Sequence, residues 1–218
     1  MKVAQFTFNA FAENTFVLWD ESKEAVIVDP GMTDENEDVI LFDFIEEQQL
    51  KPVLLLNTHC HIDHILGNQA VINRYKVEYW THRNELAMLE RAPSASMMWG
   101  VPYRESPLPT KFIDEGDKVR FGNTTLDILF VPGHSPGHLA FIHRDEKLVI
   151  GGDVLFQGSV GRVDLPGSNP QDLVASIQNK MYALPDDFTV YPGHGSETTI
   201  GREKQSNIFV RPDWNGLT

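Results

Sequence analysis

The sequence has very little cysteine, because Cys60 is the only one among 218 residues. One cysteine cannot close an intramolecular disulfide, which excludes a small secreted fold held together by disulfides. Near the N-terminus, Gln5, Thr7 and Asn9 interrupt any apolar run, so no signal-peptide core can be drawn. A reducing cytoplasm is the simplest compartment, and we expect a cytoplasmic protein.

Long hydrophobic runs and an excess of positive charge are also absent. The run Val53–Leu56 is among the longest strictly aliphatic ones, far below the roughly 18 residues that cross a bilayer. Lys and Arg number 18 against 31 Asp and Glu, which gives a formal net charge of −13. Such a charge repels phosphate backbones and anionic membrane surfaces. We therefore expect neither a nucleic-acid partner nor a membrane partner.

The composition that remains is that of an ordinary folded protein, with 41% hydrophobic and 22% charged residues. The length and the lack of repeats or linkers favour one domain over residues 1–218, as a monomer or a small homo-oligomer. Strands are expected at 3–8, 15–19, 25–28, 53–56, 77–81, 118–121, 125–131, 139–143, 147–150 and 188–191, and helices at 35–49, 68–75, 84–91, 173–184 and 199–207.

Strands outnumber helices in this pattern, and tight turns join several neighbouring strands. This favours an α/β (α+β) fold of two mixed β-sheets packed between helices over a purely parallel, doubly wound sheet. Residues 92–109 are rich in Pro, Ser and Met, and are expected to form an irregular insertion or lid. Its Met97–Trp99 run could form an apolar wall over a site, or serve core packing or an oligomer contact.

Three histidines and one carboxylate follow the expected strand 53–56 within six residues. His59 and His61 are two apart on an extended stretch, so both imidazoles can face one side, which suits a divalent metal. Asp63 and His64 come at the turn into the next helix and can face a second metal. Three buried histidines beside a carboxylate would be costly as mere core polar residues.

Three further polar residues each follow an expected strand through one or two glycines: His134, Asp153 and His194. Glycines allow a tight backbone course, so each strand can deliver a metal-binding side chain at one edge of a sheet. The alternative is that all these residues are ordinary turn and core polar groups. Together with the first cluster they make seven candidate ligands, enough for two metals if Asp153 bridges them.

The His-x-His-x-Asp-His cluster with the later His, Asp and His resembles the metallo-β-lactamase fold superfamily. The resemblance covers nearly the whole chain and implies a four-layer αββα sandwich of two mixed β-sheets flanked by helices. The segments that carry it are Val26–Gly31, Gly133–His138, Gly152–Asp153 and Tyr191–Gly195. Together with Leu155–Phe156 and Gly161–Asp164, they are most similar to short glyoxalase II-like (hydroxyacylglutathione hydrolase-like) enzymes.

This resemblance implies a dinuclear metal hydrolase that acts on a small-molecule thioester. The first metal would be bound by His59, His61, His134 and Asp153, and the second by Asp63, His64, Asp153 and His194. Zinc is the default for both, with iron or manganese possible. A hydroxide shared by the metals would attack the thioester carbonyl, and Asp63, His64 and Asp153 are assigned to catalysis.

Three departures from the resemblance concern the substrate. The additional C-terminal helical region of full-length glyoxalase II has no counterpart before Thr218. Arg162 matches the family's glutathione-binding lysine and is the expected substrate anchor, or else a salt-bridge partner of Asp164. Asp164 and Ser196 stand where the family has tyrosines, and the Asp164 carboxylate would repel the glycine carboxylate of glutathione unless Arg162 pairs with it.

Other functions fit parts of the pattern. Persulfide dioxygenases resemble the same family and bind one iron through residues that would here be His59, His134 and Asp153. A non-catalytic zinc module is disfavoured because structural zinc sites are closed by four protein ligands. A true β-lactamase is disfavoured because the match is to the thioesterase branch.

The remaining histidines and two further residues are expected to be supporting. His138 is expected to make structural hydrogen bonds, and His82 and His143 to be surface or loop residues. Cys60 should point away from its two neighbouring ligands as a buried, inert thiol. Asp29 is expected to support the first cluster.

Overall fold

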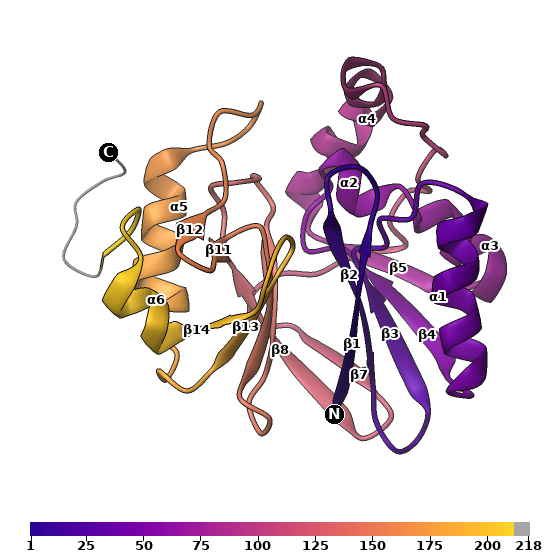
Figure 1. Cartoon of the computed structure of the whole chain (residues 1–218), viewed down its shortest axis with the longest axis horizontal. Coiled ribbons are helices and arrows are strands. Elements are labelled where there is room, and N and C mark those ends of the chain that lie inside the picture. Colours follow the sequence, from indigo (N-terminus) through magenta and orange to yellow (C-terminus); the bar gives the residue numbers. More distant parts are fainter. Residues whose placement is uncertain (212–218) are drawn as a thin grey trace. The chain divides into compact units, whose positions relative to one another are not determined.

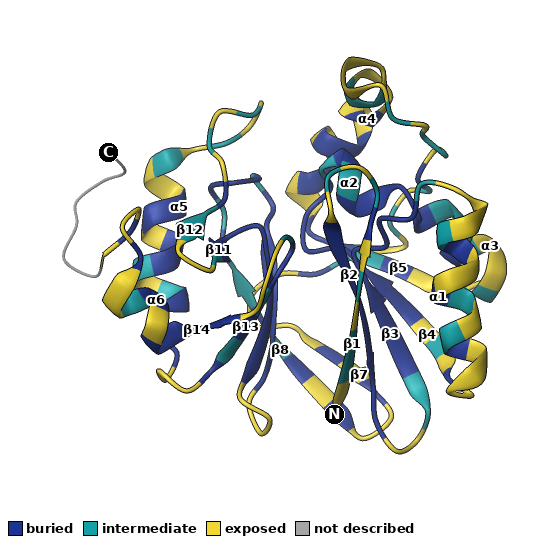
Figure 2. Ribbon diagram, viewed as in Figure 1, coloured by how far each residue is buried: buried dark blue, intermediate teal, exposed yellow. Residues whose placement is uncertain are grey.

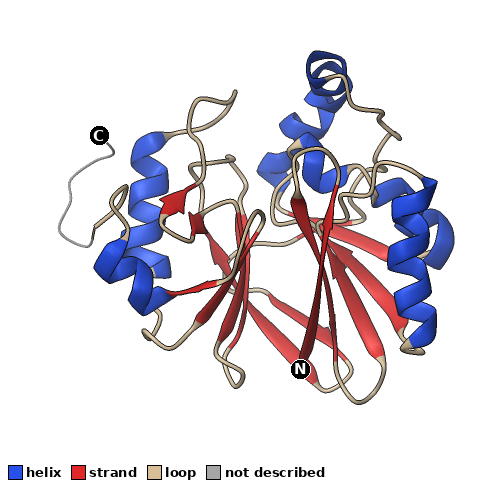
Figure 3. Cartoon of the chain, viewed as in Figure 1, coloured by secondary structure: helices blue, strands red, loops and turns tan. Residues whose placement is uncertain are grey.

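The structure is a computed structural model that describes residues 1–211, and no helix in this range is long and apolar enough to cross a membrane. Its contacts divide the chain into two compact units, described separately below. Unit 1 comprises residues 1–113 and 119–125, and unit 2 comprises residues 114–118 and those from 126 onward. The secondary structure of both is drawn in Figure 3.

Unit 1 contains a six-stranded mixed sheet in the order β1-β2-β3-β4-β5-β6. Strands β1 to β3 are antiparallel neighbours, whereas β3 to β6 are parallel. Its elements are β1 (Lys2–Phe8), β2 (Glu13–Trp19), β3 (Glu24–Val28), α1 (Glu35–Glu47), β4 (Lys51–Leu56), α2 (Ile62–Ile65), α3 (Asn68–Tyr75), β5 (Glu78–Thr81), the 3₁₀ turn η1 (Arg83–Glu85), α4 (Leu86–Trp99) and β6 (Lys111–Phe112).

Helices α1 and α3 cover one face of this sheet (Figure 1). Asp34 starts α1 by accepting hydrogen bonds from the backbone N–H groups of Asn36 and Glu37. The buried residues of α1 then pack on the sheet in one apolar cluster with α3. Because β3 and β4 are parallel, their carboxyl ends lie at one edge of the sheet, where the first predicted ligands begin.

Unit 2 contains most of a second mixed sheet, which has the order β14-β13-β10-β9-β8-β7; residues 119–125, in β7 and at the start of β8, belong to unit 1. Strands β10 and β13 are parallel, whereas the pairs β8–β9, β9–β10 and β13–β14 of this sheet are antiparallel. Its elements are β7 (Lys118–Phe121), β8 (Thr124–Phe130), β9 (Leu139–His143), β10 (Leu148–Gly152), α5 (Pro170–Ser176), the π turn η2 (Ile177–Met181), β13 (Thr189–Pro192), β14 (Thr198–Thr199) and α6 (Ile200–Ser206), with a separate hairpin of β11 (Leu155–Phe156) and β12 (Ser159–Val160).

The core of unit 2 lies between its sheet and the segment formed by α5 and η2. Leu173 and Ile177 are fully buried there with Val149 of β10 and Val190 of β13. Figure 2 shows the buried side of α5 in dark blue and its exposed side in yellow. An apolar stripe on one side of a helix is what packing on a sheet requires.

The structure confirms the prediction of two mixed sheets with flanking helices, and corrects one segment. The expected irregular stretch 92–109 is helical as far as Trp99, with Pro93 inside α4. The α4 side chains Met88, Leu89 and Ala92 pack against α2, and this burial outweighs the lost hydrogen bond at Pro93.

The apolar run at the end of α4 is not core. Met97 and Met98 are each 77% exposed, and the half-exposed Trp99 contacts the ring of Phe11 edge-on. The two-residue strands β6, β11, β12 and β14 were not predicted, because such short segments carry no periodic pattern.

Candidate metal centre

Four of the seven predicted ligands lie in unit 1, on the segment that leaves β4 and enters α2. We call residues 57–64 the ligand loop. His59 and His64 are fully buried, whereas His61 and Asp63 are half-buried. The ring centroid of His59 lies 4.8 Å from that of His61 and 4.1 Å from that of His64. Three imidazoles are thus gathered at the carboxyl end of β4.

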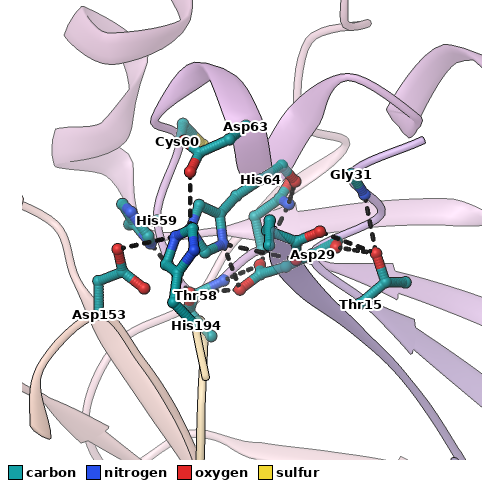
Figure 4. Close-up of polar contacts among 12 residues, drawn as sticks. Thr15, Asp29, Gly31, Thr58, His59, Cys60, Asp63, His64, Asp153 and His194 are labelled. Atoms are coloured by element: carbon teal, nitrogen blue, oxygen red, sulfur yellow. Dashed lines mark hydrogen bonds and ion pairs between the residues drawn. The ribbon is translucent and has the colours of Figure 1, made fainter. Parts of the chain in front are cut away.

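The side chain of Asp29 holds the start of the ligand loop by hydrogen bonds (Figure 4). Its Oδ1 accepts a hydrogen bond from the Thr58 N–H at 2.7 Å, and its Oδ2 accepts one from the Thr58 hydroxyl at 2.6 Å. The Asn57 amide also donates to Oδ1, at 3.2 Å. Asp29 is buried and has a φ of +49°, in the left-handed region that few non-glycine residues adopt. Its predicted role in supporting the cluster agrees with these contacts.

The partners of His59 and His64 determine which ring nitrogen carries the proton. The Thr58 hydroxyl donates to Asp29, so its oxygen is left to accept from His59 Nδ1, which lies 3.1 Å away. His64 Nδ1 lies 3.2 Å from Asp29 Oδ2, an acceptor. Both rings therefore carry the proton on Nδ1 and the lone pair on Nε2, the state in which a histidine binds a metal through Nε2.

The other three predicted ligands lie in unit 2. Asp153 follows β10 and His194 follows β13, and these parallel neighbours end at the same edge of the sheet. The Asp153 carboxylate Oδ2 lies 3.5 Å from His134 Nε2 and 3.4 Å from His194 Nε2. One carboxylate therefore faces two histidines.

His134 is oriented in the same way as the histidines of unit 1. Its Nδ1 lies 2.8 Å from the carbonyl oxygen of Arg162, which can only accept a hydrogen bond. The proton is again on Nδ1 and the lone pair on Nε2. The preceding Gly133, with a φ of +138°, cannot be replaced by a larger residue, because an added Cβ would lie 2.2 Å from the backbone nitrogen of Leu173.

His138 supports Asp153, as its spacing suggested. The ring is fully buried, and its Nε2 accepts a hydrogen bond from the Asp153 backbone N–H at 3.0 Å. The lone pair of that nitrogen is therefore used on the protein backbone. His138 fixes the course of the chain where β10 ends and the Asp153 side chain begins.

The predicted ligands fit a divalent metal by donor type and by orientation. The set consists of imidazole and carboxylate groups, which suits zinc, iron or manganese. His59, His64 and His134 each use Nδ1 on a protein acceptor, which directs Nε2 to a ligand. Within unit 1, single ligand atoms of Asp29, His59 and His64 also lie within 4.8 Å of one another.

Arg162, the predicted substrate anchor, forms a two-pronged salt bridge with Asp164. Arg162 Nε and Nη2 each donate to one Asp164 oxygen at 2.7 Å, and both side chains are exposed. The hydrogen bond from Arg162 lowers the pKa of Asp164 to about 2. The Arg162 charge is thus already paired, and its backbone is joined to His134.

The expectations for Cys60 and the two other histidines have different outcomes. Cys60 is buried, with Sγ 3.4 Å from the Tyr79 hydroxyl, and burial raises the pKa of its thiol well above the ordinary value. The thiol is buried, as expected. His82 lies in the loop between β5 and η1, as expected, whereas His143 lies in β9; both are buried, and their Nδ1 atoms accept backbone N–H groups of Asn84 and Glu146. They stabilise turns.

Several residues that hold the ligand loop were not predicted. The Asn57 amide donates to the carbonyl of His64, and the Asn9 amide donates to the carbonyl of Asp63. The buried carboxylate of Glu13 lies 3.8 Å from His64 Nδ1. Asn9 and Glu13 are far from the loop in sequence and belong to no spacing pattern, so only the folded chain brings them to it.

Comparisons with known proteins place these features in a family. The family described as the metallo-beta-lactamase superfamily matches residues 9–194, a range that contains all seven predicted ligands. A relative named hydroxyacylglutathione hydrolase GloC, from Haemophilus influenzae, is 37% identical over 212 residues, which cover 96% of this chain and 98% of that protein.

Two solved structures are similar over nearly the whole chain. The B3 metallo-beta-lactamase BLEG-1 has a TM-score of 0.88 and 34% identity, and the match covers 96% of this chain and 99% of that one. TTHA1623, solved in a di-iron-bound form, has a TM-score of 0.85 and 35% identity over 95% of this chain and 100% of that one. The fold expected from the resemblance is confirmed.

Proposed function

The chain belongs to the metallo-β-lactamase superfamily, and from this premise we propose that it is a dinuclear metal-dependent thioester hydrolase of the hydroxyacylglutathione hydrolase type. The proposal assigns two divalent metals to His59, His61, Asp63, His64, His134, Asp153 and His194. Zinc is the first choice, with iron or manganese as alternatives.

The observation that carries the proposal is the fixed orientation of the histidines. His59, His64 and His134 each have Nδ1 within 3.2 Å of a hydrogen-bond acceptor of the protein. Such contacts hold the ring and raise the basicity of Nε2, as is typical of histidines that bind metals. Three rings held in this way, close to the carboxylates of Asp63 and Asp153, favour a metal site over ordinary core packing.

Residues around the predicted ligands hold them in place for hydrolysis. When bound, the two metals supply Lewis acidity and lower the pKa of a coordinated water toward neutrality. Asp29 and Thr58 hold the histidines of unit 1, and His138 holds the backbone of Asp153. A thiolate leaves without a strong general acid, because its conjugate acid has a much lower pKa than an alcohol or amine. The site is therefore suited to thioesters.

The substrate assignment is supported by the relative that carries the name hydroxyacylglutathione hydrolase. Arg162 is the proposed anchor for a carboxylate of the thiol portion. Its guanidinium is paired with Asp164, so a substrate carboxylate would have to share or displace that partner. We expect Arg162→Ala to raise KM for an acidic thioester more than it lowers kcat.

The test combines metal content with a thioester panel. The protein is purified without chelators or nickel resin, metals are counted by elemental mass spectrometry, and thiol release is followed from S-lactoylglutathione and uncharged acyl thioesters. About two equivalents of metal per chain with thioester hydrolysis would support the proposal. The variant His59→Ala is the inactive control.

One equivalent of iron per chain, with oxygen uptake on glutathione persulfide and no thioester hydrolysis, would instead favour the persulfide dioxygenase alternative. Metal binding without hydrolysis of any thioester in the panel would contradict the proposed substrate class, but it would still support the proposed metal sites.

A further inference from the structure

A buried carboxylate that belongs to no predicted motif contacts the ligand loop. Glu85 ends the turn η1 and is fully buried. Its Oε2 accepts a hydrogen bond from the backbone N–H of Cys60 at 2.7 Å. Burying a carboxylate is costly, and a short bond to a backbone N–H is one of the contacts that offset this cost.

The position of that N–H matters because Cys60 stands between His59 and His61. On an extended segment, the side chains of neighbouring residues point to opposite sides. The Cys60 side chain accordingly lies in an apolar cluster with Ile62, Leu66 and Met88, away from the imidazoles. Fixing the Cys60 backbone therefore fixes the rotation of the chain that aims both neighbouring rings.

Further polar contacts hold the Cys60 side chain and the start of the ligand loop. The Cys60 Sγ lies 3.4 Å from the Tyr79 hydroxyl and 3.9 Å from Thr81 Oγ1. The Thr81 hydroxyl donates to the carbonyl of Asn57, at the start of the ligand loop, at 3.2 Å. These groups are all buried, so the loop is held by Asp29 on one side and by β5 and η1 on the other.

We infer that Glu85 is a positioning residue for the metal site: by accepting the Cys60 N–H, it sets the direction of the His59 and His61 imidazoles. The inference rests on the proposed metal-binding function and adds a residue to it. Its hydrogen bond to the Cys60 N–H acts through the backbone between two predicted ligands.

The experiment compares Glu85→Gln and Glu85→Ala with Glu90→Gln, an exposed carboxylate on α4 that serves as the matched control. Zinc affinity is measured by competition with a chromophoric chelator. Because Cys60 is the only cysteine, its rate of reaction with excess thiol reagent, in the range where the rate depends on neither reagent concentration nor pH, reports on opening of the ligand loop in the zinc-free protein. Circular dichroism and urea unfolding give the folded fraction.

We expect zinc affinity to fall about 10-fold in Glu85→Gln, which keeps an acceptor but loses the charge, and about 100-fold in Glu85→Ala. Cys60 should react faster in both Glu85 variants and at the wild-type rate in Glu90→Gln. Wild-type zinc affinity and thiol rate in Glu85→Ala would overturn the inference. A loss of zinc affinity that is fully explained by a smaller folded fraction of the variant would also overturn it.

Failure of the proposed function is distinguishable from failure of this inference. If the unaltered protein binds no zinc, iron or manganese, the proposed function fails. The thiol rates then decide the role of Glu85 alone: a faster reaction in Glu85→Ala at an unchanged folded fraction supports it, and an unchanged rate overturns it.

Discussion

Asp153 lies between two predicted histidine ligands of unit 2. Its Oδ2 faces His134 and His194, and its backbone N–H is held by His138. Under the proposal Asp153 binds both metals, so replacing this one residue should affect the binding of both.

Asp153→Ala is expected to lose both metals together rather than one. The measurement is metal content per chain by elemental mass spectrometry after gel filtration. The control is Asp145→Ala, an exposed carboxylate in the turn before β10 that should keep the wild-type content. Retention of one equivalent by Asp153→Ala would show that this residue does not bridge.

His138→Ala tests a residue that supports a ligand without binding metal. The variant leaves the buried Asp153 N–H without its acceptor, which costs about 1–3 kcal/mol of stability. We expect a lower unfolding midpoint in urea and a modest loss of activity, with most of the metal still bound. Complete loss of metal would mean that His138 is itself a ligand.

Close packing between elements holds the ligand loop as firmly as individual bonds do. Gly31 follows β3, and an added Cβ there would lie 2.0 Å from Glu13 Oε2 and 2.8 Å from the carbonyl oxygen of Asp63. Neither group can move without disturbing a neighbour: Glu13 accepts from Thr15, and the Asp63 carbonyl accepts from Asn9. The start of β2, the end of β3 and α2 thus meet at a glycine.

Gly31→Ala is therefore expected to weaken metal binding about 10-fold or more as well as to lower stability, because the clash displaces the backbone of a ligand. The control is Gly100→Ala at the end of α4, where a Cβ meets nothing but φ is +68°. That variant should lose about 1 kcal/mol of stability and keep its zinc affinity. Equal zinc affinities in the two variants would refute the packing argument.

A pair of turns in unit 1 is joined by a carboxylate whose pKa is unusually low. Burial would raise the pKa of Asp20, but hydrogen bonds from Ser22, Asn123 and Thr124 outweigh it and lower the pKa to about 2. A carboxyl whose folded pKa is depressed stabilises the protein above its unfolded pKa of about 3.9, and this stabilisation is lost as the pH falls toward about 2.

Asp20→Asn should therefore cost about 1 kcal/mol at pH 7, and the difference from wild type should shrink between pH 5 and pH 3. Urea unfolding at each pH measures it, with the exposed Asp43→Asn of α1 as control. A difference that stays constant down to pH 3 would contradict the assignment.

The predictability of each element depended on how local its determinants are. Helix α3 and strands β7 and β9 have the predicted bounds, because a short periodic pattern ends in turn residues on each side. Helix α4 was predicted too short, because its buried face packs on α2 and tolerates Pro93. The cluster of candidate ligands was recognised from the sequence because four of them stand within six residues. Glu85 was not, because it meets Cys60 from 25 residues away.

At the scale of the whole molecule, metal binding and folding are linked. Metals that bind only the folded chain raise its stability, by about 2.7 kcal/mol when the free metal is 100 times the dissociation constant. We expect added zinc to raise the urea midpoint, a chelator to reverse the shift, and His59→Ala to show a much smaller one. An unchanged midpoint in the unaltered protein would contradict metal binding to the folded state.

The left-handed backbone of Asp29 has a consequence for how this protein can change over generations. Glycine would relieve the strain at its φ of +49°, but glycine cannot hold Thr58 or His64. In a library of variants, selection for abundance alone should tolerate glycine or asparagine at position 29. Selection for metal-dependent growth should keep aspartate. The difference between the residue preferences at position 29 under the two selections would then measure how much stability the protein loses in order to keep its metal site.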